Sequence, residues 1–153
     1  MTPAVADPDA VPDLADADET AWLEHTADLV RAGRFAEIDP HALAEFLTDM
    51  ARRDRREVFS RLVVLLAHLL KWTYQPERRG GSWLGTILEQ QRELRQLLDS
   101  GTLRAHAAAV FADAYADARK EAAAEAGLSR SAFPDAPPLD LDAALADPGE
   151  PRT

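Results

Sequence analysis

Apolar side chains recur three and four positions apart along most of the chain, a spacing typical of amphipathic helices. The longest series starts after Asp39 and Pro40, a capping residue followed by a residue favoured in the first helical turn. Neither glycine nor proline interrupts residues 41–72. The pattern therefore predicts one long helix over this range, or two helices with a bend near residues 52–55.

The same spacing, with flanking cap and stop signals, predicts three further helices and a short last one. They cover residues 19–32, 83–99, 103–126 and 140–146. We expect Ser82 to cap the helix over 83–99 and Gly101 to end it. In the link after the first helix, Phe35 and Ile38 are expected to tuck under the next helix. No stretch alternates like a strand, so the expected fold class is all-α: a bundle of about four main helices with short connections.

The length of 153 residues suits one domain with a real core. The predicted organisation is a flexible acidic tail over residues 1–16, a single helical-bundle domain over 17–147, and a flexible tail over 148–153. The first segment is rich in Pro, Asp and Ala, and it has too few large apolar groups to offset the entropy of ordering.

The net charge of −10 is unevenly distributed. Residues 1–50 carry a net −10, residues 51–104 a net +5, and residues 105–153 a net −5. A basic middle raises the possibility of nucleic-acid binding through the arginine collar, Arg52, Arg53, Arg55, Arg56 and Arg61. We favour pairing of these cations with acidic neighbours, because free acidic surface repels phosphate and no aromatic residues lie among them for base stacking.

The composition and the apolar runs of the chain indicate where in the cell we expect the protein. There is no cysteine, which excludes disulfides and thiolate metal sites. The longest apolar run, residues 62–70, is far shorter than the roughly 20 residues of a transmembrane helix. The first residues have neither a basic region nor an apolar region of a signal peptide. We therefore expect a cytoplasmic protein without membrane partners.

The most conspicuous stretch, residues 60–83, ends in HLLKW-x-YQPERR-xx-SW. With this signature, residues 20–147 resemble the bacterial family catalogued as domain of unknown function twenty-nine. The resemblance implies an α-helical bundle and no established activity. Departures from the family pattern include Phe46 and Thr48 within a run of glutamates, Leu139 at a tyrosine position, and Gly101 at a proline position.

Residues 71–83 form the best candidate ligand site. Arginines beside aromatic rings can stack on them, and a guanidinium can clamp a carboxylate or phosphate. The competing interpretation is a structural corner between two helices, which we favour. With the neighbouring histidine, the candidate ligand-binding residues are His68, Lys71, Trp72, Tyr74, Arg78, Arg79, Ser82 and Trp83. For His68, the default is a core imidazole bonded to Tyr74, Ser82 or a carboxylate such as Glu45.

A weaker set of candidate metal ligands, His41, Glu45 and Asp49, lies four residues apart on one helix face. We favour a solvated face there, and predict neither a bound metal nor a cofactor. No phosphate-binding glycine loop, Ser-His-Asp arrangement or HExxH motif is present, which favours a protein that is not an enzyme. The alternative is a ligand-binding or enzymatic site at the corner over residues 71–83. The leading hypothesis is a helical module that binds a protein partner or itself.

Overall fold

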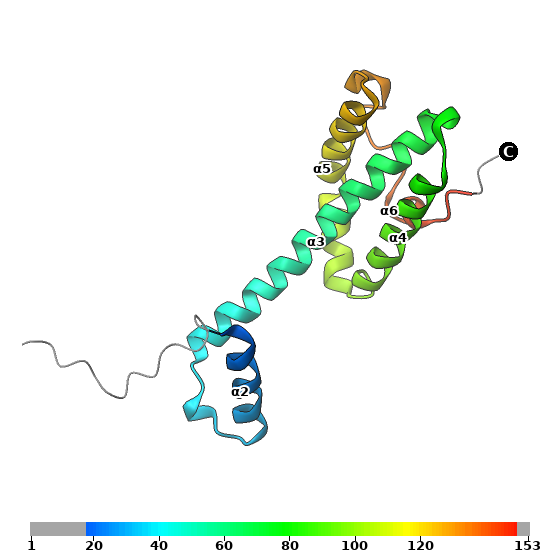
Figure 1. Cartoon of the computed structure of the whole chain (residues 1–153). Coiled ribbons are helices and arrows are strands. Elements are labelled where there is room, and N and C mark those ends of the chain that lie inside the picture. The colour runs from blue at the N-terminus through cyan, green and yellow to red at the C-terminus, as the bar shows by residue number, and fades with distance from the viewer. Residues whose placement is uncertain (1–17, 150–153) are drawn as a thin grey trace, which may run out of the picture. The chain divides into compact units, whose positions relative to one another are not determined.

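The computed structural model describes residues 18–149, which contain five α-helices and no strand. The helices are α2 (Glu19–Arg31), α3 (Pro40–Tyr74), α4 (Gly81–Leu97), α5 (Gly101–Ala126) and α6 (Leu141–Leu145) (Figure 1). Single 3-10 turns occur at Phe35–Glu37, Pro76–Arg78 and Arg130–Ala132. The predicted all-α fold is confirmed. The predicted tail over residues 1–16 lies outside the described residues, as do residues 150–153. No helix within the described range has the length and apolar character needed to cross a bilayer.

Helix α3 is one continuous helix of 35 residues, so the alternative of two bent helices is not adopted. Its start is fixed by Asp39, whose Oδ1 accepts from the backbone N–H groups of His41 and Ala42, both at 3.1 Å. Its end is fixed by Pro76, because the residue before a proline avoids helical geometry. Gln75 has φ −130° and ψ 61° and leaves the helix there.

Two predicted details of α4 are wrong. Gly80, not Ser82, is the residue before the first helical turn, because its extended backbone (φ −154°, ψ 172°) lets the helix begin at Gly81. Gly101 does not end α4, which stops at Leu97. Gly101 instead begins α5, where the Ser100 hydroxyl accepts from the backbone N–H of Leu103 at 3.3 Å.

The chain divides into two compact units, Met1–Met50 and Ala51–Thr153, with the boundary inside α3. We call residues 18–50 the N-terminal hairpin and residues 51–149 the C-terminal bundle. The hairpin comprises α2 and the first turns of α3, and the bundle comprises the rest of α3 with α4, α5 and α6. The sequence predicted a single domain over 17–147; the boundary falls within a helix, without a loop between the units.

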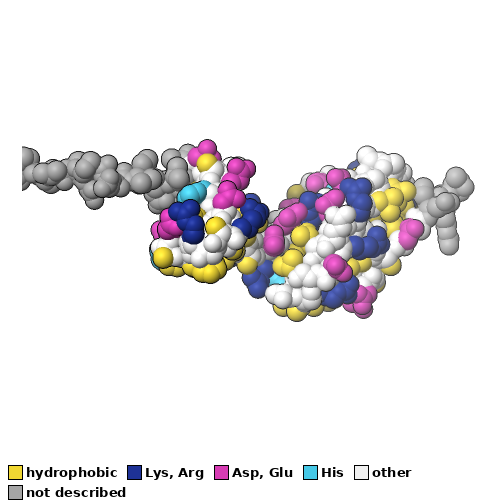
Figure 2. Space-filling view, turned by 90° about the horizontal axis from the view of Figure 1, so that it is seen from below, with side chains coloured by type: hydrophobic (Ala, Val, Ile, Leu, Met, Phe, Trp, Pro, Cys, Tyr) yellow, Lys and Arg dark blue, Asp and Glu magenta, His cyan; other side chains and the backbone are white. Residues whose placement is uncertain are grey.

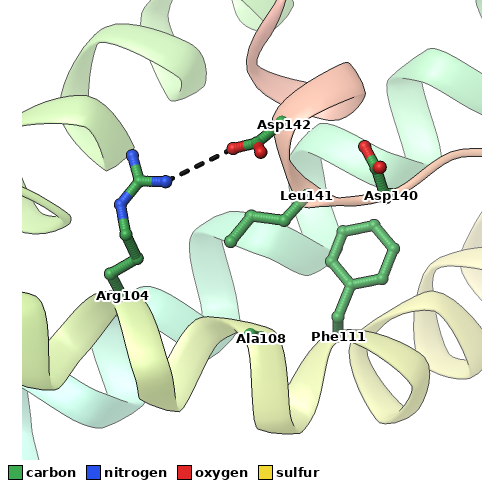
Figure 3. Close-up of a pocket in the computed structure, with 6 residues that line it drawn as sticks. All are labelled: Arg104, Ala108, Phe111, Asp140, Leu141 and Asp142. Carbon is green, nitrogen blue, oxygen red and sulfur yellow. Dashed lines mark hydrogen bonds and ion pairs between the residues drawn. The ribbon is translucent and has the colours of Figure 1, made fainter.

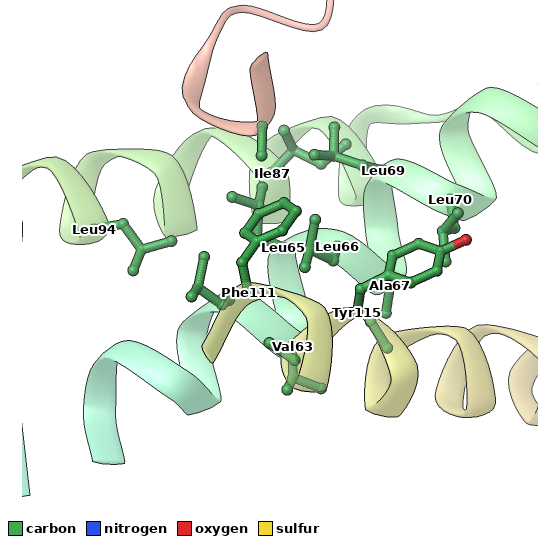
Figure 4. Packing of buried hydrophobic residues seen from close by; sticks show 14 of the residues in the cluster. Val63, Leu65, Leu66, Ala67, Leu69, Leu70, Ile87, Leu94, Phe111 and Tyr115 are labelled. Atoms are coloured by element: carbon green, nitrogen blue, oxygen red, sulfur yellow. The ribbon is translucent and has the colours of Figure 1, made fainter. Parts of the chain in front are cut away.

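The core of the bundle lies between α3, α4 and α5 (Figures 1 and 4). Leucines from α3 and Ile87 and Leu94 from α4 form its centre, and Phe111 and Tyr115 project into it from α5. The alanines of α5 recur on its buried face: Ala107, Ala114, Ala118 and Ala122 are all fully buried. These small side chains let α5 approach its neighbours closely.

The segment that follows α5, residues 128–146, is attached to the bundle through hydrogen bonds to its main-chain carbonyl oxygens. Its buried anchors are Phe133, Ala144 and Leu145. Side chains of α4 and α5 donate to carbonyl oxygens along it: Tyr115 Oη to Pro134 (2.6 Å), Arg119 Nε to Phe133 (3.2 Å), Gln91 Nε2 to Ala144 (3.0 Å) and Ala146 (2.7 Å), and Arg95 to Leu145. Long polar side chains thus satisfy backbone groups that no regular ladder satisfies.

Tyr115 should make the bundle sensitive to alkali. Its side chain is buried, and burial raises the pKa of its hydroxyl above the ordinary tyrosine value of about 10. The native state then holds this proton more tightly than the unfolded chain does. The contribution of Tyr115 to the free energy of unfolding is full below pH of about 10, and it is lost as the pH rises through the higher native pKa. Urea unfolding at several pH values up to about 11 measures this loss.

The matched variant for this measurement is Tyr115→Phe. It should cost about 1 kcal/mol at neutral pH, since the Pro134 carbonyl loses its donor, and it should flatten the alkaline decline. An equally steep decline in Tyr115→Phe would show that another group causes it.

Candidate functional site

Lys71, in the corner over residues 71–83, is a buried cation that contacts a carboxylate and an aromatic ring. Its Nζ forms an ion pair with Glu125 of α5 and lies 5.1 Å from the centre of the Trp83 ring. The ammonium is therefore neutralised by a carboxylate and covered by an aromatic face. Lys71 joins the end of α3 to α4 and α5, which is a structural role.

Arg79 is engaged in the same way with Trp72. Its Nε donates to the Trp72 carbonyl oxygen at 2.6 Å, and its guanidinium lies 5.0 Å from the centre of the Trp72 ring. The carbonyls in the last turn of a helix have no helical partner, so this bond caps α3. The predicted stacking of arginine on an aromatic ring is present, with the Trp72 side chain itself buried.

The other candidates of this corner are engaged elsewhere. His68 is half-buried and its Nδ1 lies 2.8 Å from the Val64 carbonyl oxygen, one turn earlier in α3. The predicted partners Tyr74, Ser82 and Glu45 are therefore wrong, because a carbonyl of its own helix is nearer. Tyr74 packs edge-on against Phe133 with ring centres 5.8 Å apart, while Arg78 and Ser82 are exposed. Ligand binding at residues 71–83 stays a prediction.

A different pocket lies between α5 and the segment that leads into α6 (Figure 3). It has a volume of about 350 Å³. Arg104 reaches across to Asp142 with Nη1 and Oδ1 3.3 Å apart, and Phe111 and Leu141 lie beside that pair. Asp140 is occupied as the cap of α6, where it accepts from the Ala143 N–H at 2.8 Å. The charges of this pocket thus satisfy one another.

The members of the arginine collar differ in their surroundings. Arg61 is half-buried and its Nε bonds the Glu57 carboxylate at 2.9 Å, while its Nη1 donates to Gln90 at 3.2 Å. This is the internal pairing that the sequence favoured. Arg55 and Arg56 instead line a pocket with His106 of α5, a residue that the sequence did not single out. Only the packing of α3 against α5 brings these residues together.

The N-terminal hairpin has a very small core. Trp22, Thr26 and Leu29 are its only buried residues within the range 18–50, and Trp22 meets Phe46 edge-on with ring centres 5.8 Å apart. Large apolar side chains remain in solvent: Phe35 is 67% exposed, Leu47 58%, Val30 46% and Met50 36%. Figure 2 shows hydrophobic side chains gathered along the lower edge of this unit. The prediction that Phe35 packs under α3 is wrong, because a unit this small cannot cover every apolar group.

The weak metal candidates lie in the first turns of α3. His41 Nε2 lies 3.2 Å from Glu45 Oε1, and both side chains are largely exposed. Within residues 18–149, no group of three or more His, Asp or Glu side chains is placed to hold a metal ion. Nearby, the Arg34 guanidinium donates both of its bonds to Glu37 and lowers the pKa of that carboxyl.

A family model described as "Domain of unknown function DUF29" matches residues 14–148, nearly the whole chain. No curated protein and no solved structure matches the chain.

Proposed function

We propose that this chain, which belongs to the DUF29 family of unknown function, is a helical protein-interaction module that docks a partner on its N-terminal hairpin. The observation that carries the proposal is the exposed apolar surface of the hairpin. A unit of about 40 residues or fewer generally needs a disulfide, a metal or an assembly partner for stability. The chain has no cysteine, and a partner that covers the apolar side chains would supply the missing burial. The cytoplasmic location expected from the sequence stays a prediction.

The apolar surface has the geometry of a helix-binding strip. Leu47 and Met50 continue the stripe of Leu43 and Phe46 along one face of α3, three and four positions apart. Exposed Val30 follows buried Leu29 on α2, and Phe35 lies in the turn between the two helices. A partner helix with its own apolar stripe is the ligand that such a strip accepts.

Charge favours a basic partner over a second copy of the hairpin. Residues 18–50 carry eight acidic and two basic side chains, a net charge of −6. Two such hairpins would repel each other, whereas a helix with lysines or arginines beside its apolar stripe would be attracted. We therefore identify the partner by its chemistry as a basic amphipathic helix.

The test uses labelled model peptides and the full chain. We expect a Leu/Lys amphipathic peptide to bind in fluorescence anisotropy, with affinity that falls as salt is added, and a Leu/Glu peptide of the same pattern to bind at least tenfold more weakly. The double variant Phe35→Ser/Leu47→Ser should reduce binding of the Leu/Lys peptide by about tenfold or more, because it removes the two most exposed large apolar side chains of the hairpin.

The matched control is Leu88→Ser, an exposed leucine of α4 in the C-terminal bundle, which should bind as the natural chain does. The proposal fails if both peptides bind equally, or if the hairpin variant binds like the control. Concentration-dependent dimerisation that Leu47→Ser abolishes would assign the strip to a second copy of the chain instead.

A further inference from the structure

A second surface, independent of the hairpin, lies in the C-terminal bundle. It is a pocket of about 340 Å³ between α3 and α5, lined by Arg55, Arg56, Phe59, Ser60, His106 and Val110. Its walls are i, i+4 ridges of two helices: 55/59 and 56/60 on α3, and 106/110 on α5. Its volume lies at the lower end of the range of about 300–1,000 Å³ for small-molecule pockets.

The cations of this pocket lack the partners that other arginines of the bundle have. Arg61, Arg104 and Arg119 are each paired with a carboxylate. Among residues 18–149, neither Arg55 nor Arg56 makes an ion pair or a side-chain hydrogen bond, and the lining of their pocket contains no acidic residue. The surrounding stretch, residues 51–104, has a net charge of +5, which further attracts anions.

Part of the pocket lining is apolar. Phe59 and Val110 are half-buried and pack against the bundle core, so they present a fixed apolar surface beside the guanidinium groups. The imidazole of His106 is half-buried at the same place and has no hydrogen-bond partner in the described part of the chain. The pocket therefore presents guanidinium groups, one imidazole and an apolar surface to a ligand.

We infer that this pocket binds a small organic carboxylate with an apolar body, such as a medium-chain alkanoate. A carboxylate accepts two parallel hydrogen bonds from a guanidinium group, which Arg55 and Arg56 supply. The hydrocarbon body lies on Phe59 and Val110, and removal of that area from water adds to the affinity. An inorganic anion would contact only the guanidinium groups, and an uncharged amphiphile would contact only the apolar residues of the lining.

Octanoate is the probe, titrated into the full chain with the His106 ring resonances followed by NMR. We expect saturable binding in the millimolar range or tighter, with shifts of the His106 signals. Octanamide and inorganic phosphate should each bind at least tenfold more weakly, because octanamide lacks the negative charge and phosphate lacks the hydrocarbon chain. Arg55→Gln and Arg56→Gln should each weaken octanoate binding about tenfold.

Arg92→Gln is the matched control, since Arg92 is an exposed arginine of α4, a helix that contributes no residue to this pocket, and it should leave octanoate binding unchanged. Arg56 and the control arginine are exposed and Arg55 is half-buried, and circular dichroism verifies that all three variants fold. Octanoate affinity that is equal in Arg55→Gln, Arg56→Gln and the natural chain would overturn the inference. So would phosphate binding as tight as that of octanoate. Duplex DNA that binds more tightly than octanoate and is lost in the same variants would assign these arginines to nucleic acid.

Discussion

Trp22→Ala should unfold the N-terminal hairpin while the C-terminal bundle stays folded. Truncation of a buried tryptophan to alanine costs about 3–5 kcal/mol. A folded unit of the size of residues 18–50 has a stability of only about 2–5 kcal/mol, scaled from the usual 0.05–0.15 kcal/mol per residue. The substitution removes the largest of three buried side chains and the edge-on contact with Phe46, so little remains to hold α2 against α3.

Hydrogen exchange measured by mass spectrometry separates the two units in one experiment. Amides of α2 should lose most of their protection in Trp22→Ala, whereas amides of α4 and α5 should exchange as before. The control is Val30→Ala, which shortens an exposed side chain of the same helix and should leave protection intact. Retained protection of α2 in Trp22→Ala would mean that contacts other than this small core hold the hairpin. Trp22→Ala should also no longer bind the Leu/Lys peptide, because the surface that binds it is unfolded.

Gln91→Ala should be the most destabilising polar substitution in the bundle, by about 2–4 kcal/mol. Gln91 is fully buried, and its Nε2 donates to the carbonyls of Ala144 and Ala146 at 3.0 and 2.7 Å. Truncation leaves two carbonyl oxygens without donors and opens a cavity, and these two effects add. The Oε1 of Gln91 is buried without a partner within residues 18–149, so its removal relieves an unsatisfied acceptor and offsets part of this cost.

Urea unfolding of Gln91→Ala and Gln96→Ala gives the matched comparison. Gln96 has the same side chain on the same helix, but it is exposed, and its variant should unfold within about 0.5 kcal/mol of the natural chain. Faster exchange at the α6 amides in Gln91→Ala would locate the damage. If both variants were equally stable, the clamp on α6 would contribute nothing to the native state.

The helices could be predicted because the signals that define them are local. Asp39 with Pro40 starts α3, Pro76 ends it, and Gly127 ends α5 in a left-handed conformation with φ 66°. Each signal acts within a few residues of the helix end. The error at Ser82 has the same origin, because Gly80 competes for the capping position and a serine two residues later looks equally suitable in the sequence.

The partners of buried polar side chains could not be predicted in the same way. The partner of Lys71 is Glu125, 54 residues away, and the clamp from Gln91 reaches about as far along the chain. The arginine-lined pocket likewise joins Arg55 to His106, residues that only the packing of α3 on α5 brings together. His68 shows the opposite failure, since its partner is a carbonyl one helical turn away, whereas the sequence suggests the side chains of more distant residues.

The attachment of the segment after α5 has a consequence for how its sequence can vary. Tyr115, Arg119, Gln91 and Arg95 bind its carbonyl oxygens, which every amino acid presents alike. Most side chains of residues 128–146 can therefore vary in evolution without loss of these hydrogen bonds. The exceptions are the side chains that pack on the bundle, pair with it or cap α6, namely Phe133, Asp135, Leu139, Asp140, Leu141, Asp142, Ala144 and Leu145. The side chains that donate these hydrogen bonds belong to α4 and α5. Substitutions of these donors should therefore be tolerated less well than most substitutions within residues 128–146.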